Sequence, residues 1–109
     1  PLLIAIAMGT NATAASFDCR KASTGIEQVI CEDPELNRLD EKMGRLYHEA
    51  RGIPGMKQEQ RDWVGFRNHN CGSSDGCLLA ETKKRIRELK KALGKSGGSA
   101  SSGNKPHRG

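Results

Sequence analysis

Aromatic side chains are scarce in this chain of 109 residues, which has only four of them: Phe17, Tyr47, Trp63 and Phe66. Four rings are too few for a platform on which nucleic-acid bases stack. Several catalytic motifs are missing as well, among them H-E-x-x-H and the glycine-rich loops that bind phosphates or dinucleotides. A chain this short also has little interior in which to enclose a catalytic cleft. We therefore expect no enzymatic activity, no cofactor and no nucleic-acid partner.

Long apolar segments are also lacking, and the mean hydropathy of −0.67 excludes a protein with several membrane spans. Residues 1–8 read PLLIAIAM, an apolar run that is too short to cross a bilayer. The small residues that follow fit the pattern read by a signal peptidase. We expect residues 1–15 to be a signal peptide, truncated at its start and cleaved near Ala14 or Ala15; a buried N-terminal helix is the alternative. The mature protein would then be periplasmic or secreted, with no transmembrane segment.

Residues 94–109 have the composition of a disordered, basic tail rich in glycine and serine. They contain no Leu, Ile, Val or aromatic residue, so burial cannot offset the entropy lost on ordering. Three of the 18 basic residues and none of the 13 acidic ones lie there. Much of the net charge of +5 therefore belongs to the tail and does not indicate a nucleic-acid surface. A single domain, residues 16–93, remains.

Between residues 16 and 93 the apolar residues recur every three or four positions, and no segment alternates as a strand would. The sequence therefore predicts an all-α domain of four helices, one short and three longer. The short helix begins at Thr24, which can form a capping box with Glu27. The next helix begins at Asp33, an N-cap residue followed by proline in the first turn, and ends near Gly52.

The third helix is expected from about Lys57 to His69, with Trp63 as its main core residue. The fourth follows the segment 74–76, and Asp75 is its expected N-cap. One side of the fourth helix is apolar, and the other side is basic: Lys83, Lys84, Arg85, Arg87, Lys90 and Lys91. This basic run is interpreted either as a solvated helix face or as a surface for an anionic partner such as a lipid or a cell-wall polymer.

Four cysteines in an exported chain predict two disulfides, which a small helical domain needs because its hydrophobic core is limited. Three pairings are formally possible, and loop geometry favours Cys19–Cys31 and Cys71–Cys77. Each closure typically contributes about 2–4 kcal/mol of stability. A zinc site is the alternative use of four cysteines, but neither pair has the close C-x-x-C spacing of a zinc ribbon. We therefore expect no metal.

The segment between Cys71 and Cys77 differs in kind from the helices around it. It is polar, and we expect it to be exposed and held rigid between two bonded cysteines. Small exported inhibitors preorganise contact loops in this way. Ser73, Ser74 and Asp75 are therefore candidate binding residues, with a plain helix connection as the alternative.

Several short motifs point to a family. The sequence reads Phe-Asp-Cys at residues 17–19, Asp-Pro-Glu-Leu-x-x-Leu-Asp at residues 33–40 and Glu-Gln-Arg-x-Trp at residues 59–63. Arg67, Cys71, Cys77 and Leu78 follow in the same order as in the family pattern. From Ser16 to Leu89 the chain resembles the lysozyme-inhibitor LprI-like N-terminal domain. The resemblance implies a small, helical, cysteine-bridged bacterial protein that is exported, from a family whose named member is a lipoprotein that inhibits lysozyme.

This chain departs from the family pattern in two ways. No cysteine follows the apolar N-terminal run directly, so we do not expect a lipid anchor. Gly44 and Gly65 fall inside predicted helices, where glycine costs about 1 kcal/mol relative to alanine. Such glycines indicate either close helix packing or a less stable domain.

The resemblance implies a protein partner, a lysozyme-type glycosidase whose cleft the chain would occlude, with Ser73, Ser74 and Asp75 as first contacts. Lysozymes of the common animal type are strongly basic, so an inhibitory face is expected near the acidic stretch 27–41 or near the 71–77 turn. The alternative hypothesis is a non-inhibitory module of the cell envelope. Its anionic polymer or partner protein would bind the basic face formed by Lys83, Lys84, Arg87, Lys90 and Lys91.

Overall fold

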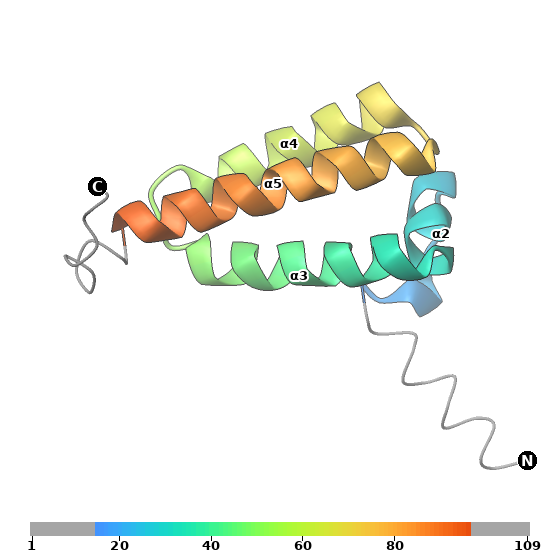
Figure 1. The fold of residues 1–109 in the computed structure, drawn as a ribbon, viewed down its shortest axis with the longest axis horizontal. Coiled ribbons are helices and arrows are strands. Elements are labelled where there is room, and N and C mark those ends of the chain that lie inside the picture. The colour runs from blue at the N-terminus through green and yellow to red at the C-terminus, as the bar shows by residue number, and fades with distance from the viewer. Residues whose placement is uncertain (1–14, 97–109) are drawn as a thin grey trace, which may run out of the picture.

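The computed structural model describes residues 15–96, in which all regular secondary structure is helical (Figure 1). A short 3-10 helix, η1 (Cys19–Lys21), precedes the four α-helices: α2 (Gly25–Glu32), α3 (Pro34–Ala50), α4 (Met56–Cys71) and α5 (Asp75–Ser96). The predicted all-α domain with one short and three longer helices is confirmed. The expected signal peptide, apart from Ala15, and residues 97–109 of the expected tail lie outside the described residues.

The first two α-helices begin at the residues that the sequence predicts. The hydroxyl of Thr24 accepts the backbone N–H of Glu27, and the Glu27 carboxylate accepts the N–H of Thr24 in return. The Asp33 carboxylate accepts the N–H groups of Glu35 and Leu36, at 3.0 and 3.1 Å. These bonds satisfy backbone donors that have no partner within the helix. Local side chains therefore determine where α2 and α3 start.

Helix α4 begins at Met56, one residue before the expected start, whereas the start of α5 differs from the expectation. Gly55 precedes α4 with a φ of 84°, and no side chain caps the helix. Ser74, rather than Asp75, is positioned to cap α5: its hydroxyl accepts the N–H of Cys77 at 3.4 Å, and its carbonyl accepts the N–H of Leu78. Asp75 is the first helical residue instead, where its charge still favours the helix dipole. At its far end α5 continues to Ser96, three residues past the expected boundary.

The three long helices lie lengthwise beside one another, and α2 crosses their end (Figure 1). Helix α5 packs along α3 and also contacts α4 and α2. Two apolar clusters fill the interior. The cluster nearer α2 consists of Ala15, Ile30, Leu36, Cys71 and Leu78. The cluster among the long helices consists of Met43, Ala50, Met56, Trp63, Ile86 and Leu89.

Arg85 does not lie on the basic face, and that expectation is wrong. Its side chain is only 2% exposed, and its guanidinium donates to Gln60 Oε1 and Glu59 Oε2, both at 2.9 Å. It also lies over the ring of Trp63, 5.8 Å from the ring centre. The physical reason is helical spacing: position 85 lies about two turns after the buried Leu78, on the same side of α5.

Trp63 is buried, as predicted, whereas Phe66 on the same helix is 53% exposed. The two disulfides join Cys19 to Cys31 and Cys71 to Cys77, with Cα atoms 5.9 and 5.3 Å apart. This is the pairing favoured by loop geometry. It excludes the zinc alternative, because no cysteine within residues 15–96 is free. Both bridges lie at the α2 end of the domain and hold the first cluster together.

The two helical glycines differ in their surroundings, and this leads to a paired prediction. A methyl group on Gly44 would lie 2.7 Å from Ser16 Cβ and 3.2 Å from its Cα, whereas one on Gly65 would meet nothing within 4 Å. We expect Gly65→Ala to raise the free energy of unfolding by about 1 kcal/mol, because alanine is the better helix former. Gly44→Ala should lower the free energy instead, because the segment around Ser16 must move. Urea unfolding at neutral pH measures both; equal stabilisation would contradict the close packing at Gly44.

Candidate functional site

The candidate contact loop lies between the two bonded cysteines. Cys71 is buried, whereas Ser73, Ser74 and Asp75 are exposed, so the loop rises directly from the core. The start of α2 supports it, because a methyl group on Gly25 would lie 3.1 Å from Ser73 Oγ. The loop is thus fixed covalently at both ends and packed from one side. Such a segment loses little entropy when it binds a partner.

Residues 72–76 also read G-x-S-x-G, which is the spacing of a nucleophile elbow. A nucleophile elbow turns from a strand into a helix and exposes the serine hydroxyl. Here the segment joins two helices, and the Ser74 hydroxyl is engaged with the N–H of Cys77. The local structure therefore matches a helix cap rather than a nucleophile.

Two carboxyl groups meet beside the loop. Asp33, at the start of α3, and Asp75, at the start of α5, share a hydrogen bond. This bond raises the pKa of Asp75, and the negative charges of Asp33 and Glu35 raise it further. The same bond lowers the pKa of Asp33, with help from the backbone N–H groups at the start of α3. The pair therefore holds one proton more readily than two separate aspartates would.

A shallow hollow of about 410 Å³ opens beside this pair. It is lined by Val29, Glu32, Asp33, Pro34 and Asp75. Three of these five residues are acidic, and two of them lie at helix starts: Asp33 is the N-cap of α3, and Asp75 is the first residue of α5. The loop and the hollow together form what we call the acidic end, defined by Ser73, Ser74, Asp75, Asp33 and Glu32. Its chemistry suits a cationic or hydrogen-bond-donating surface on a partner.

The basic face predicted on α5 is partly as expected. Lys83, Lys84, Arg87, Lys90 and Lys91 are all exposed. Lys83 lies 3.9 Å from Glu35 of α3, and both side chains are 52% exposed, so this pair contributes little to stability.

Sequence reasoning missed a second row of cations on α3: Arg38, Lys42 and Arg45. Lys42 lies beside Lys90 of α5, and this neighbouring charge is the main cause that lowers the pKa of Lys42. Arg38 and Arg45 add smaller effects in the same direction. The three residues recur at helical spacing along α3, a signal that the sequence contained. What it could not show is that α3 packs against α5 and brings these cations next to Lys90.

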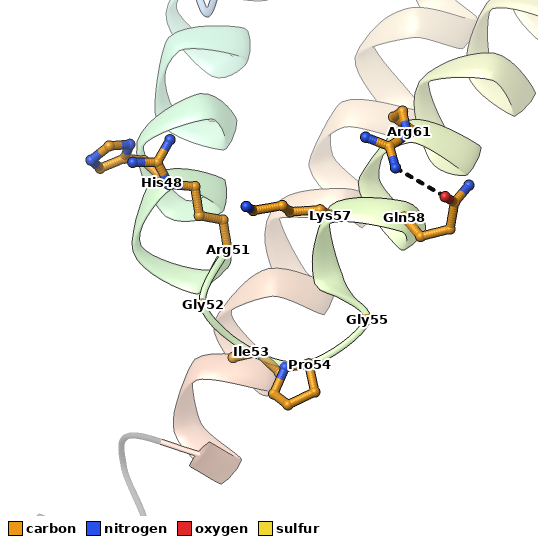
Figure 2. A pocket seen from close by; sticks show the side chains of 9 residues that line it. All are labelled: His48, Arg51, Gly52, Ile53, Pro54, Gly55, Lys57, Gln58 and Arg61. Atoms are coloured by element: carbon orange, nitrogen blue, oxygen red, sulfur yellow. Dashed lines mark hydrogen bonds between the residues drawn. The ribbon is translucent and has the colours of Figure 1, made fainter.

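A further basic hollow lies where the chain passes from α3 to α4. It has a volume of about 620 Å³, and its polar lining includes His48, Arg51, Lys57 and Arg61 but no acidic residue. Figure 2 shows Lys57 extending from α4 toward α3, whereas the side chain of Arg51 turns along α3 toward His48. Arg61 donates a hydrogen bond to Gln58 at 3.0 Å. Positive charge thus extends over much of the surface away from the acidic end.

Comparison with known proteins identifies a family for this chain. The family model described as Lysozyme inhibitor LprI matches residues 19–89, most of the chain. The chain belongs to the LprI lysozyme-inhibitor family. The matched region contains all four cysteines and the whole candidate contact loop.

Two relatives illustrate the range of the family. An uncharacterized protein of Rhizobium meliloti is 26% identical, with 84% of this chain and 90% of the relative aligned. Lipoprotein LprI of Mycobacterium tuberculosis is 28% identical over 73% of this chain, and the alignment spans 44% of that lipoprotein. No solved structure matches the chain significantly. None of the helices within residues 15–96 combines the length and the apolarity that crossing a bilayer requires.

The carboxyl pair leads to a prediction about pH. Because the pKa of Asp75 is raised in the folded chain, its contribution to stability is present below its ordinary value of 3.8 and is lost as the pH rises through the folded value. Asn does not ionise, so Asp75→Asn removes this loss of stability at higher pH while keeping a hydrogen-bonding side chain. The difference in free energy of unfolding, variant minus wild type, should therefore increase as the pH rises from 3.8 toward neutrality.

Urea unfolding over that pH range measures the difference. Asp62→Asn, on the exposed side of α4, is the matched control and should show no such trend. A constant difference between Asp75→Asn and wild type would contradict the shared hydrogen bond.

Proposed function

We propose that this protein is an exported inhibitor of a lysozyme-type glycosidase and that it places its acidic end against the cleft of the enzyme. The observation that carries the proposal is the loop of Ser73, Ser74 and Asp75, which is exposed, disulfide-bounded and adjacent to Asp33. Membership in a family named for lysozyme inhibition supports this class of partner. Inhibition would be steric: the loop occupies space that the polysaccharide needs.

Charge supports the acidic end as the contacting surface. Lysozymes of the common animal type are basic, and opposite charges accelerate encounter and disfavour wrong orientations. Along α5 and α3 the surface is basic and would be repelled. Of the surfaces described above, the acidic end is therefore the one suited to a basic enzyme.

Rigidity supports the same surface. The disulfide between Cys71 and Cys77, the Ser74 cap and the packing against Gly25 restrain the loop before any partner arrives. A restrained loop retains more of its contact energy as affinity, because little conformational entropy remains to be lost. The acidic end is thus preorganised as well as charged.

Inhibition assays with purified protein test the proposal. Asp75→Lys should raise the inhibition constant against a basic lysozyme at least about tenfold. The reason is that attraction between the Asp75 carboxylate and the basic surface of the enzyme becomes repulsion between two positive charges. Glu49→Lys, the same change of charge on an exposed site of α3, should alter the constant less than about twofold. Circular dichroism confirms that both variants are folded. Wild-type protein inactive against both animal and bacterial lysozymes would overturn the proposal.

A second candidate function is favoured by one specific observation. Lys42 and Lys90 lie next to each other although their charges repel, and the repulsion is strong enough to lower the pKa of Lys42. An anionic polymer of the cell envelope, bound across α3 and α5, would neutralise both side chains. In this alternative the protein is an interaction module of the envelope rather than an inhibitor.

The two functions are separable by charge. Lys42→Gln combined with Lys90→Gln should weaken binding to an anionic cell-wall polymer about thirtyfold, since each lysine near an anionic surface contributes about 1 kcal/mol. Binding of the wild type should weaken as salt is added. Asp75→Lys is the control and should not weaken it. Polymer binding that neither salt nor the double variant changes would contradict this function.

A further inference from the structure

Asp40 of α3 is a buried carboxylate whose hydrogen bonding is incomplete. Its side chain is only 1% exposed. One oxygen, Oδ2, accepts the backbone N–H of Ser16 at 2.9 Å and also the Ser16 hydroxyl. The other, Oδ1, has no hydrogen-bond partner and lies 3.7 Å from Nη1 of Arg67. A buried charge in this state is costly, because it has lost water without gaining full replacement.

The charges around Asp40 do not balance either. Arg67, on α4, is the nearest cation, but its Nε and Nη2 both donate to Asn68 instead. Arg67 also interacts with the carboxylate of Glu27 on α2. Two carboxylates thus share one guanidinium. One further positive charge close to Asp40 would neutralise the group.

Ser16 is the residue placed to supply that charge. Gly44, one turn along α3 from Asp40, has no side chain, so Ser16 can rest against the helix. The main-chain nitrogen of Ser16 faces Asp40, as does its hydroxyl. If the chain began at Ser16, this nitrogen would be an ammonium group with three donors in place of the single donor of an amide.

We propose that an export peptidase cuts the chain between Ala15 and Ser16 and that the new amino terminus pairs with Asp40. Hydrolysis adds one water molecule across the peptide bond: Ala15 leaves with the carboxylate, and the Ser16 amine takes up a proton at neutral pH. Ala15 is buried in the folded chain, so the cut precedes folding, as it does when a leader is removed during translocation. This inference rests on export, which is part of the proposed function.

A double-mutant cycle on purified chains tests the pairing. One chain begins at Ser16 and the other at Ala15, which moves the N-terminal ammonium by one residue. Each chain is prepared with Asp40 and with Asp40→Asn. The affinity tag is one whose removal leaves no extra residue at the amino terminus. With Asp40 present, the Ser16 chain should be the more stable, with an unfolding equilibrium constant at least about tenfold smaller in urea. With Asp40→Asn the Ser16 chain should lose this advantage, because only the burial of Ala15 then distinguishes the two chains.

Glu41→Gln is the matched control. Glu41 lines a hollow next to Ser16, but it pairs with Arg45 at 3.3 Å, so its removal should leave the difference between the two chains intact. If Asp40→Asn fails to fold, a second measurement takes the place of the cycle: the rate at which an amine-specific reagent modifies the amino terminus of each chain. The Ser16 chain should react at least about tenfold more slowly than the Ala15 chain, because an ion-paired ammonium is protected.

N-terminal sequencing of protein exported with its leader completes the test and should find Ser16 first. A different first residue, equal stability of the two chains, or equal reaction rates would overturn the inference. None of these measurements involves lysozyme. A failure here is therefore distinct from a failure of the proposed inhibition.

Discussion

The layer of charged and aromatic side chains around Trp63 is the interaction on which the arrangement of the three long helices depends. The guanidinium groups of Arg67 and Arg85 lie over the Trp63 ring, 5.1 and 5.8 Å from its centre. Arg85 belongs to α5, and Arg67 reaches Asp40 on α3. Desolvated contacts of this kind contribute about 2 kcal/mol each. A core of limited size thus joins α3, α4 and α5 through one tryptophan.

Covalent bonds supplement hydrophobic burial at the other end of the domain. The cluster beside α2 contains Cys71, and Cys19 and Cys77 pack against it. Each of the two disulfides therefore contacts this cluster. Helix α2 has only eight residues and buries Ile30 alone, so it depends on its bridge to remain in place. The second bridge restrains the polar loop between Cys71 and Cys77 while leaving it exposed. The two bridges therefore stabilise this end of the domain and restrain the loop that we propose as the contact surface.

Separation of charge gives the molecule two different faces. The acidic end gathers carboxylates from the starts of α3 and α5, where the helix dipoles stabilise them. Cations extend along α3 and α5 beyond it and surround the hollow shown in Figure 2. A basic protein and an anionic polymer would consequently approach from different sides. This separation of charge, rather than the overall net charge, is the basis on which we propose a partner for each surface.

The sequence by itself determined the features that depend on neighbours along the chain. The caps at Thr24 and Asp33, the four helices and the two disulfides follow from residues a few positions apart. Only the tertiary structure decided which distant side chains meet: Asp33 with Asp75, Lys42 with Lys90, Arg85 with Gln60, and Ser16 with Asp40. Each of these pairs joins two segments whose relative position is set by helix packing. Local propensity does not contain that information, because the rotation of one helix against another depends on the whole core.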